Sequence, residues 1–125
     1  MKKILVSGGA GFLGSHLISR LVDEYEVYCL DNYFTGNVAN INQFKSKSNF
    51  HIIEHDIINF FDKKFDFIYN LASPASPKYY QLNPIETIKT NILGSINLLE
   101  LAKKHNSRIM QFSTSEIYGD PKESP

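Results

Sequence analysis

A run of glycines near the start of the chain, SGGAGFLG, constrains the fold most strongly. It follows a short apolar stretch, residues 4–6, that is typical of a buried strand, and it leads into an apolar-periodic segment that predicts a helix over residues 11–23. Gly8 would allow the tight bend, Gly11 a close approach of the backbone to a ligand, and Gly14 close packing of the helix on the strand. Because the first N–H groups of such a helix lack partners and point out of the turn, this motif predicts a pyrophosphate site.

A second predicted strand, residues 26–30, ends at Asp31, roughly 20 residues after the first glycine, where dinucleotide-binding units place an acid that binds the adenosine ribose hydroxyls. A carboxylate at this point repels a 2′-phosphate, and no arginine stands in residues 32–36 to neutralise one. The two motifs together favour NAD over NADP. The alternatives are that the glycine run is only a flexible loop and that Asp31 caps a turn.

Composition narrows the classes of function. The 125 residues predict a single domain, and 13 basic against 13 acidic side chains give a net charge of zero, which argues against nucleic acid or a charged membrane as partner. The start of the chain has no apolar run of signal-peptide or membrane-spanning length, which predicts a cytoplasmic protein. The single cysteine, Cys29, is interpreted as a small buried hydrophobe. The histidines lack zinc-type spacing, and no metal is expected.

The rest of the chain alternates predicted strands and connections. Further strands are predicted over residues 50–54, 65–70 and 108–113, and the polar connection 32–48 is expected to hold a short helix near 38–44. The stretch Ser73–Tyr80 is predicted to be a proline-stiffened loop that is neither strand nor helix. A long helix is predicted from Pro84, behind an Asn83 cap, to about His105.

This alternation predicts an α/β fold, a Rossmann-like doubly wound parallel sheet with strand order 3-2-1-4-5, over residues 1–125. In such sheets ligands bind at the carboxyl ends of the strands, and the glycine run, Asp31 and Thr114 fall on that edge. Asp56 follows the third strand and would reach the adenine amino group, or else be a solvated turn acid. Leu71–Ser73 follow the fourth, and such small residues would let a ribose or nicotinamide approach the backbone.

Six stretches carry a resemblance to a known family: SGGAGFLGSHL, LDNYFTG, HDI, NLASPASP, NPIETIKTNILGS and STSEIYGDP. In this order and at these intervals they resemble the extended short-chain dehydrogenase/reductase family. Within it they are most similar to the nucleotide-sugar decarboxylases that convert UDP-glucuronate to UDP-xylose. The glycine turn and the acid are general to the family, whereas DNYFTG, LASPASP and STSEIYGDP are more specific. The resemblance spans nearly the whole chain.

The resemblance and the motifs assign roles to individual residues. The residues assigned to NAD are Gly8, Gly11, Phe12, Leu13 and Gly14 in the glycine turn, Asp31, Asn32, Thr35 and Gly36 after the second strand, Asp56 and Ile57 after the third, Leu71, Ala72 and Ser73 after the fourth, and Thr90. Tyr80, Lys89 and Asn97 are implied for the UDP-sugar, although Lys89 would also suit a solvated helix face. The Thr114 hydroxyl is implied to bind the oxygen being oxidised and Glu116 to assist proton handling, or the segment merely caps a turn.

The implied reaction oxidises C4 of UDP-glucuronate to a 4-keto intermediate, which loses carbon dioxide before the hydride is returned. The family's proton-transfer pair, Tyr-x-x-x-Lys on a helix, is missing. Tyr118 and Lys122 match the spacing, but the glycine and proline between them exclude a helix.

The chain is therefore interpreted as the amino-terminal, NAD-binding half of a decarboxylase, inactive by itself. A homodimer is expected for the full-length parent, through helices that include residues 84–105. Two alternatives stay open: part of an NAD-dependent nucleotide-sugar 4,6-dehydratase or epimerase, and a non-catalytic dinucleotide-binding module.

Overall fold

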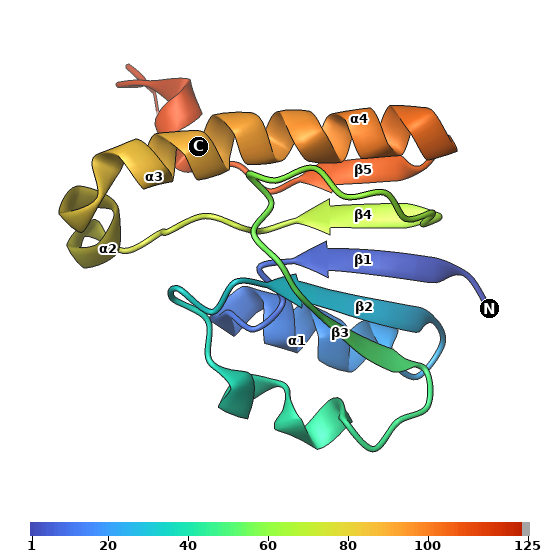
Figure 1. Cartoon of the computed structure of the whole chain (residues 1–125). Coiled ribbons are helices and arrows are strands. Elements are labelled where there is room, and N and C mark those ends of the chain that lie inside the picture. The colour runs from blue at the N-terminus through green and yellow to red at the C-terminus, as the bar shows by residue number, and fades with distance from the viewer. Residues whose placement is uncertain (124–125) are drawn as a thin grey trace.

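Five parallel strands form one sheet in the computed structural model, which describes residues 1–123. The strands are β1 (Lys3–Ser7), β2 (Glu26–Asp31), β3 (Phe50–Glu54), β4 (Phe67–Asn70) and β5 (Arg108–Gln111). Their order is β3-β2-β1-β4-β5, which confirms the predicted topology (Figure 1). The central strand β1 pairs with β2 on one side and with β4 on the other, so the carboxyl ends of these three strands meet at one edge.

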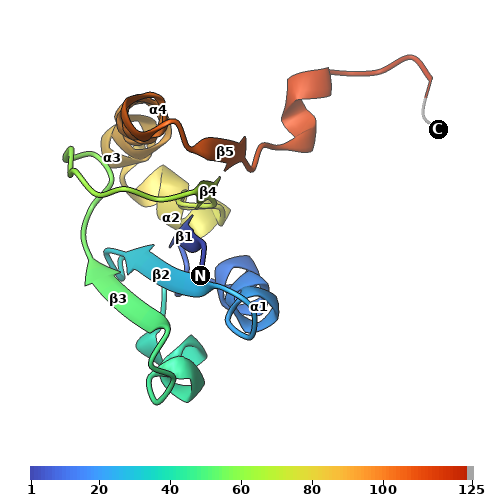
Figure 2. The same ribbon diagram turned by 90° about the vertical axis from the view of Figure 1, so that its right-hand side faces the viewer.

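Helices cover both faces of the sheet, with α1 (Phe12–Leu21) on one face and α4 (Ser95–His105) on the other (Figure 2). The helix α3 (Pro84–Lys89) precedes α4 and extends past the carboxyl ends of the strands (Figure 1). Alternate side chains of β1 serve two cores, because successive residues of a strand point to opposite faces. Ile4 and Val6 join the core that contains the α1 residue Ile18, whereas Leu5 joins the core that contains the α4 residue Leu98. No helix within residues 1–123 is both long enough and apolar enough to cross a membrane.

The helix predicted over residues 84–105 is one rod of three parts. Between α3 and α4 lies a π-helical turn, η3 (Thr90–Gly94). Asn83 caps the rod as predicted, and its side chain accepts a hydrogen bond from the Glu86 N–H group. The π turn was not predicted, because it depends on what the rod touches rather than on local helix propensity.

The prediction that residues 73–80 form neither strand nor helix was wrong for the second half of that stretch. The helix α2 (Pro77–Leu82) starts at Pro77, where the missing N–H group costs no hydrogen bond. The expected helix near residues 38–44 is instead two 3₁₀ turns, η1 (Val38–Asn40) and η2 (Asn42–Phe44).

The apolar side chains of α1 are only partly directed at the sheet. Ile18 and Val22 are buried in the core, but the side chains of Phe12 and Leu13 are 75% and 61% exposed. These two residues lie in the first turn of the helix, where the buried Gly14 makes the close contact with the rest of the fold instead. Phe12 and Leu13 therefore face solvent rather than the core.

Cys29 lies fully buried in β2, as predicted. Burial raises the pKa of its thiol to about 12, with the nearby Asp31 carboxylate acting in the same direction. A Cβ on Gly9 would lie only 2.6 Å from the Cys29 sulfur, so the sulfur packs directly against this glycine. Cys29 is thus a packing residue beneath the glycine turn.

Candidate functional site

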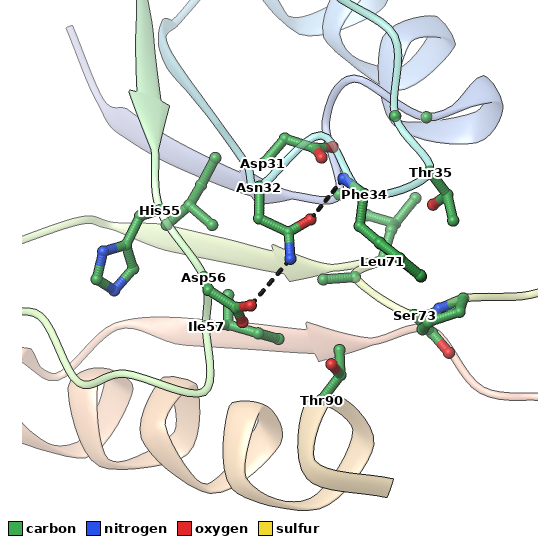
Figure 3. Close-up of a pocket in the computed structure, with 16 residues that line it drawn as sticks. Asp31, Asn32, Phe34, Thr35, His55, Asp56, Ile57, Leu71, Ser73 and Thr90 are labelled. Carbon is green, nitrogen blue, oxygen red and sulfur yellow. Dashed lines mark hydrogen bonds between the residues drawn. The ribbon is translucent and has the colours of Figure 1, made fainter. Parts of the chain in front are cut away.

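A cleft of about 570 Å³, counting its open mouth, lies where the carboxyl ends of β1, β2, β3 and β4 meet (Figure 3). Its walls are the glycine turn, the loops after β2, β3 and β4, and one residue of the helical rod, Thr90. All the residues assigned to NAD from the sequence line this cleft, except Phe12, Leu13 and Gly14. Residues that the sequence reasoning did not assign to the site are Leu30, Phe34, His55 and Pro74.

The glycine turn is built from close backbone contacts. Gly8 has a φ of 71°, a conformation that side chains disfavour, and its N–H group donates to the Leu30 carbonyl oxygen at 2.8 Å. A Cβ on Gly8 would also lie 2.8 Å from the backbone of Leu71, so this glycine lets the loops after β1 and β4 touch. The tight bend expected at Gly8 is therefore present.

Gly11 and Gly14 have different surroundings. A Cβ on Gly11 would meet only the Gly8 carbonyl oxygen, at 3.2 Å, which leaves the backbone open toward the cleft. A Cβ on Gly14 would collide with that same oxygen. Gly14 thus brings the first turn of α1 onto the glycine turn itself, rather than onto the strand as predicted.

Asp31 ends β2 with a carboxylate that is 8% exposed and holds two backbone groups. Its Oδ2 accepts a hydrogen bond from the Ala10 N–H group at 2.9 Å, and its Oδ1 accepts one from the Tyr33 N–H group at 2.8 Å. Gly36 packs against the same carboxylate, and a Cβ there would lie 2.8 Å from Oδ1. Each carboxylate oxygen has a second lone pair, so Asp31 keeps the capacity to accept hydrogen bonds from a ligand in the cleft.

The Ala10 carbonyl group fastens the long polar connection after β2 to the glycine turn. It accepts hydrogen bonds from the Asn37 N–H group at 3.0 Å and from Asn40 Nδ2 at 2.8 Å. The Ala10 N–H group is thus satisfied by Asp31 at the end of β2, and its carbonyl group by residues that follow this strand. These contacts were not predicted, because an asparagine-rich connection carries no motif that indicates which residues it binds.

Asp56 stands on the opposite wall, at the carboxyl end of β3. Its Oδ2 accepts a hydrogen bond from Asn32 Nδ2 at 2.9 Å, and Asn32 Oδ1 in turn accepts one from the Phe34 N–H group at 3.0 Å (Figure 3). The other oxygen, Oδ1, accepts from the Ile58 N–H group at 3.1 Å. Asp56 is therefore an anchored wall residue rather than a freely solvated acid.

A buried polar network ties together the strand ends beneath Leu71–Ser73. The Ser7 hydroxyl donates to Asn70 Oδ1 at 2.7 Å, and Asn70 Nδ2 donates to Gln111 Oε1 at 2.8 Å. Asn70 is 1% exposed, and the ends of β1, β4 and β5 are joined through it. An asparagine at the end of a buried strand was the signal available in the sequence, and it was not used.

The residues implied for the UDP-sugar lie outside the set that lines the cleft. Lys89 is on the surface of α3, where its ammonium group lies 2.8 Å from Glu86 Oε1, as the solvated-helix alternative predicts. Tyr80 projects from α2. Asn97 Nδ2 donates to the Ile57 carbonyl oxygen at 2.8 Å. A role for these three in substrate binding stays a prediction.

Thr114 and Glu116 are exposed and do not line the cleft. Thr114 caps the 3₁₀ turn η4 (Ser115–Tyr118), and its hydroxyl oxygen accepts a hydrogen bond from the Glu116 N–H group at 3.2 Å. Tyr118 ends this turn, and Gly119 follows with a φ of 69°, so Tyr118 and Lys122 do not share a helix, as predicted.

Within residues 1–123, no three His, Cys, Asp or Glu side chains gather as metal ligands would.

Comparison with known proteins assigns the chain to a family. A family model described as GDP-mannose 4,6 dehydratase matches residues 5–125. The chain belongs to the GDP-mannose 4,6 dehydratase family. This agrees with the resemblance to extended short-chain dehydrogenases/reductases that the sequence motifs carry.

Relatives of this GDP-mannose 4,6 dehydratase family member include UDP-glucuronic acid decarboxylase 1 of Danio rerio, 49% identical over 125 residues. UDP-glucuronic acid decarboxylase 3 of Arabidopsis thaliana is 49% identical over 121 residues. These alignments cover 99% and 95% of this chain but 30% and 35% of the relatives, so the chain spans about a third of their length.

Two solved structures resemble the fold closely. The UDP-N-acetylglucosamine 4-epimerase of Methanobrevibacter ruminantium, in complex with UDP-N-acetylmuramic acid, superposes with a TM-score of 0.88 at 31% identity, over 99% of this chain and 41% of that one. The Bordetella bronchiseptica enzyme WbmG, in complex with NAD, superposes with a TM-score of 0.81 at 28% identity, over 98% of this chain and 40% of that one.

Replacing Asp31 should destabilise the fold as well as weaken ligand binding. Asp31→Ala leaves the buried N–H group of Ala10 and the partly buried N–H group of Tyr33 without acceptors. We expect a loss of about 1–3 kcal/mol in the free energy of unfolding, measured by urea titration. Asp56 is more exposed, so Asp56→Ala is the matched control and should lower the free energy of unfolding by less. An unchanged urea midpoint for Asp31→Ala would contradict the structural role given to this carboxylate.

Proposed function

We propose that this chain is the NAD-binding portion of a nucleotide-sugar decarboxylase that converts UDP-glucuronate to UDP-xylose. The observation that carries the proposal is the 49% identity, along the whole chain, to the UDP-glucuronic acid decarboxylase of Danio rerio. Because the chain corresponds to 30% of that relative, the activity is proposed for a longer protein that contains it. A cytoplasmic location and the lack of a nucleic-acid partner remain predictions from the sequence.

The cleft has the features that a dinucleotide requires. The first turn of α1 has no side-chain cap, so its N–H groups are free to bind a pyrophosphate beside the open backbone of Gly11. The Asp31 carboxylate lines the cleft with acceptor capacity for ribose hydroxyls. These residues fit NAD, and the NAD complex of the structural neighbour WbmG supports the same assignment. The chemistry that NAD supplies when bound is hydride transfer from and back to the sugar.

Thr114 is proposed to hold the oxygen at the oxidised carbon. Its hydroxyl oxygen already accepts a hydrogen bond from the Glu116 N–H group, so the hydroxyl proton is available to donate to a substrate. A carbonyl that forms at that oxygen would gain a donor, which favours loss of carbon dioxide from the neighbouring carboxylate. Removal of the hydroxyl proton needs a base such as the family's Tyr-x-x-x-Lys pair, which residues 1–123 do not contain on a helix.

An epimerase is the second candidate, because solved structures that resemble the fold include nucleotide-sugar 4-epimerases. That likeness rests on 31% identity, against 49% for the decarboxylases. The decarboxylase is therefore the better supported of the two.

A homodimer is proposed through the helical rod. Its outer face carries an apolar stripe that points away from the sheet and is 45–65% exposed: Ile85, Ile88, Ile92, Ile96 and Leu99. An exposed stripe of this kind is typical of a helix that packs against another helix. A second copy of the chain would cover it.

The chain should bind NAD more tightly than NADP, by about tenfold or more, because the Asp31 carboxylate repels a 2′-phosphate. Isothermal calorimetry with both ligands measures the ratio. Asp31→Asn keeps the shape of the side chain without its charge. It should reduce the ratio of the affinity for NAD to the affinity for NADP. Equal affinity of the unchanged chain for the two cofactors would count against the proposed ribose site.

The proposed reaction is tested in a chimera in which this chain replaces the aligned residues of the Danio rerio relative. We expect UDP-glucuronate to give UDP-xylose and carbon dioxide, followed by NMR, and Thr114→Val to reduce the rate by about 10²-fold or more. The 125-residue chain alone should show no turnover. A chimera that binds NAD but epimerises a UDP-sugar instead would favour the second candidate.

The proposed dimer is tested by sedimentation. The unchanged chain should sediment as a dimer, and Ile92→Glu/Ile96→Glu as a monomer, because charges on the stripe resist burial. Lys103→Glu, on an exposed position of the same helix, is the control and should leave the dimer intact. A monomeric unchanged chain at micromolar concentration would argue against this surface.

A further inference from the structure

The helical rod on one face of the sheet holds a wall of the cleft through one residue, Ile57. Ile57 follows Asp56 in the loop after β3, lines the cleft and is 3% exposed. Two residues of the rod, Gly94 and Asn97, contact it. The first adjoins its side chain and the second binds its backbone.

Gly94 leaves no room for a side chain between the rod and Ile57. A Cβ at this position would lie 2.5 Å from Ile57 Cγ1 and collide with its Cδ1. Gly94 has ordinary right-handed helical dihedral angles, so backbone strain does not require a glycine here. The requirement comes from the close approach of Ile57 to the rod.

Asn97 fixes the backbone of the same residue. Its Nδ2 donates to the Ile57 carbonyl oxygen at 2.8 Å, which joins α4 to the loop after β3 across 40 positions of sequence. Two contacts thus fix the position of Ile57: its side chain packs against Gly94, and its carbonyl oxygen accepts a hydrogen bond from Asn97.

The π-helical turn connects these contacts to a second residue that lines the cleft. It begins at Thr90, which lines the cleft, and it ends at Gly94, which touches Ile57. π-helical turns are rare and occur often at functional sites, because they change where the flanking residues point. Asp56, next to Ile57, is held in turn by Asn32.

We propose that Gly94 and Asn97 are positioning residues for the cofactor cleft, which hold Ile57 and so set where the Asp56–Ile57 wall lies relative to Thr90. This inference rests on the proposed binding of NAD. It also gives Asn97 a task in shaping the cleft, different from the contact with a UDP-sugar that the family resemblance implies.

The test compares NAD affinity, by calorimetry, in single and double variants of the 125-residue chain. Gly94→Ala should raise the Kd for NAD about tenfold or more, since the added methyl group pushes Ile57 into the cleft or the rod away from it. Ile57→Ala removes both Cγ1 and Cδ1, so the further change Gly94→Ala in that background should cost little affinity. Asn97→Ala should raise the Kd about three- to tenfold. Glu100→Ala, exposed on the same helix, is the control and should leave the Kd unchanged.

The rescue separates positioning from a general loss of stability, because alanine stabilises a helix relative to glycine and does not by itself weaken the rod. Should Gly94→Ala fail to fold, the Ile57→Ala pair and Asn97→Ala decide the matter. If the unchanged chain binds NAD and both Gly94→Ala and Asn97→Ala bind it equally well, the inference is overturned while the proposed function stands. A loss at Gly94→Ala that persists in the Ile57→Ala background also overturns it. If the unchanged chain does not bind NAD, the proposed function fails and the inference fails with it.

Discussion

The hydrogen bond between the Asp31 carboxylate and the Ala10 N–H group is the interaction on which the cleft depends. It joins the end of β2 to the glycine turn, and the Ala10 carbonyl then binds Asn37 and Asn40 farther along the chain. One residue of the glycine turn thereby organises the long polar connection after β2. Because the carboxylate is buried, its charge is stabilised by the N–H groups of Ala10 and Tyr33 rather than by water. The acid expected to recognise a ribose is therefore also part of the frame.

Missing side chains define the rest of the cleft. Gly8 allows the loops after β1 and β4 to touch, Gly14 allows α1 to approach the glycine turn, and Gly94 allows the rod to approach Ile57. In each case the added Cβ would meet backbone or a buried side chain rather than solvent. Only glycine permits these three close contacts, and the hydrogen bonds of Asp31, Asp56 and Asn97 hold neighbouring parts of the cleft together.

The sequence predicted what depends on local pattern. Apolar runs and the glycine turn predicted the five strands and their order, and strand order alone placed Asp31, Asp56 and Leu71 on one edge. What depends on contacts between distant residues was missed. The π turn at Thr90–Gly94 and the bond from Asn40 to Ala10 follow from tertiary packing, and the exposure of Phe12 follows from where α1 meets the sheet. The helix at Pro77 was missed for a different reason, since proline was taken as a breaker where it stands at a first helical position.

The pairing of β1 with β4 has a consequence for the order in which the chain folds. β1 and β2 are close in sequence, but Ile4 pairs with Phe67, and the Ser7 hydroxyl bonds to Asn70, 63 positions away. Closing a loop of that length lowers the conformational entropy of the chain before the contacts that stabilise the pairing can form. This pairing therefore belongs to the slow part of folding. The cleft lies across this junction and is completed only when it closes. Binding in the cleft would then report the last step of folding, whereas helix content would report the earlier ones.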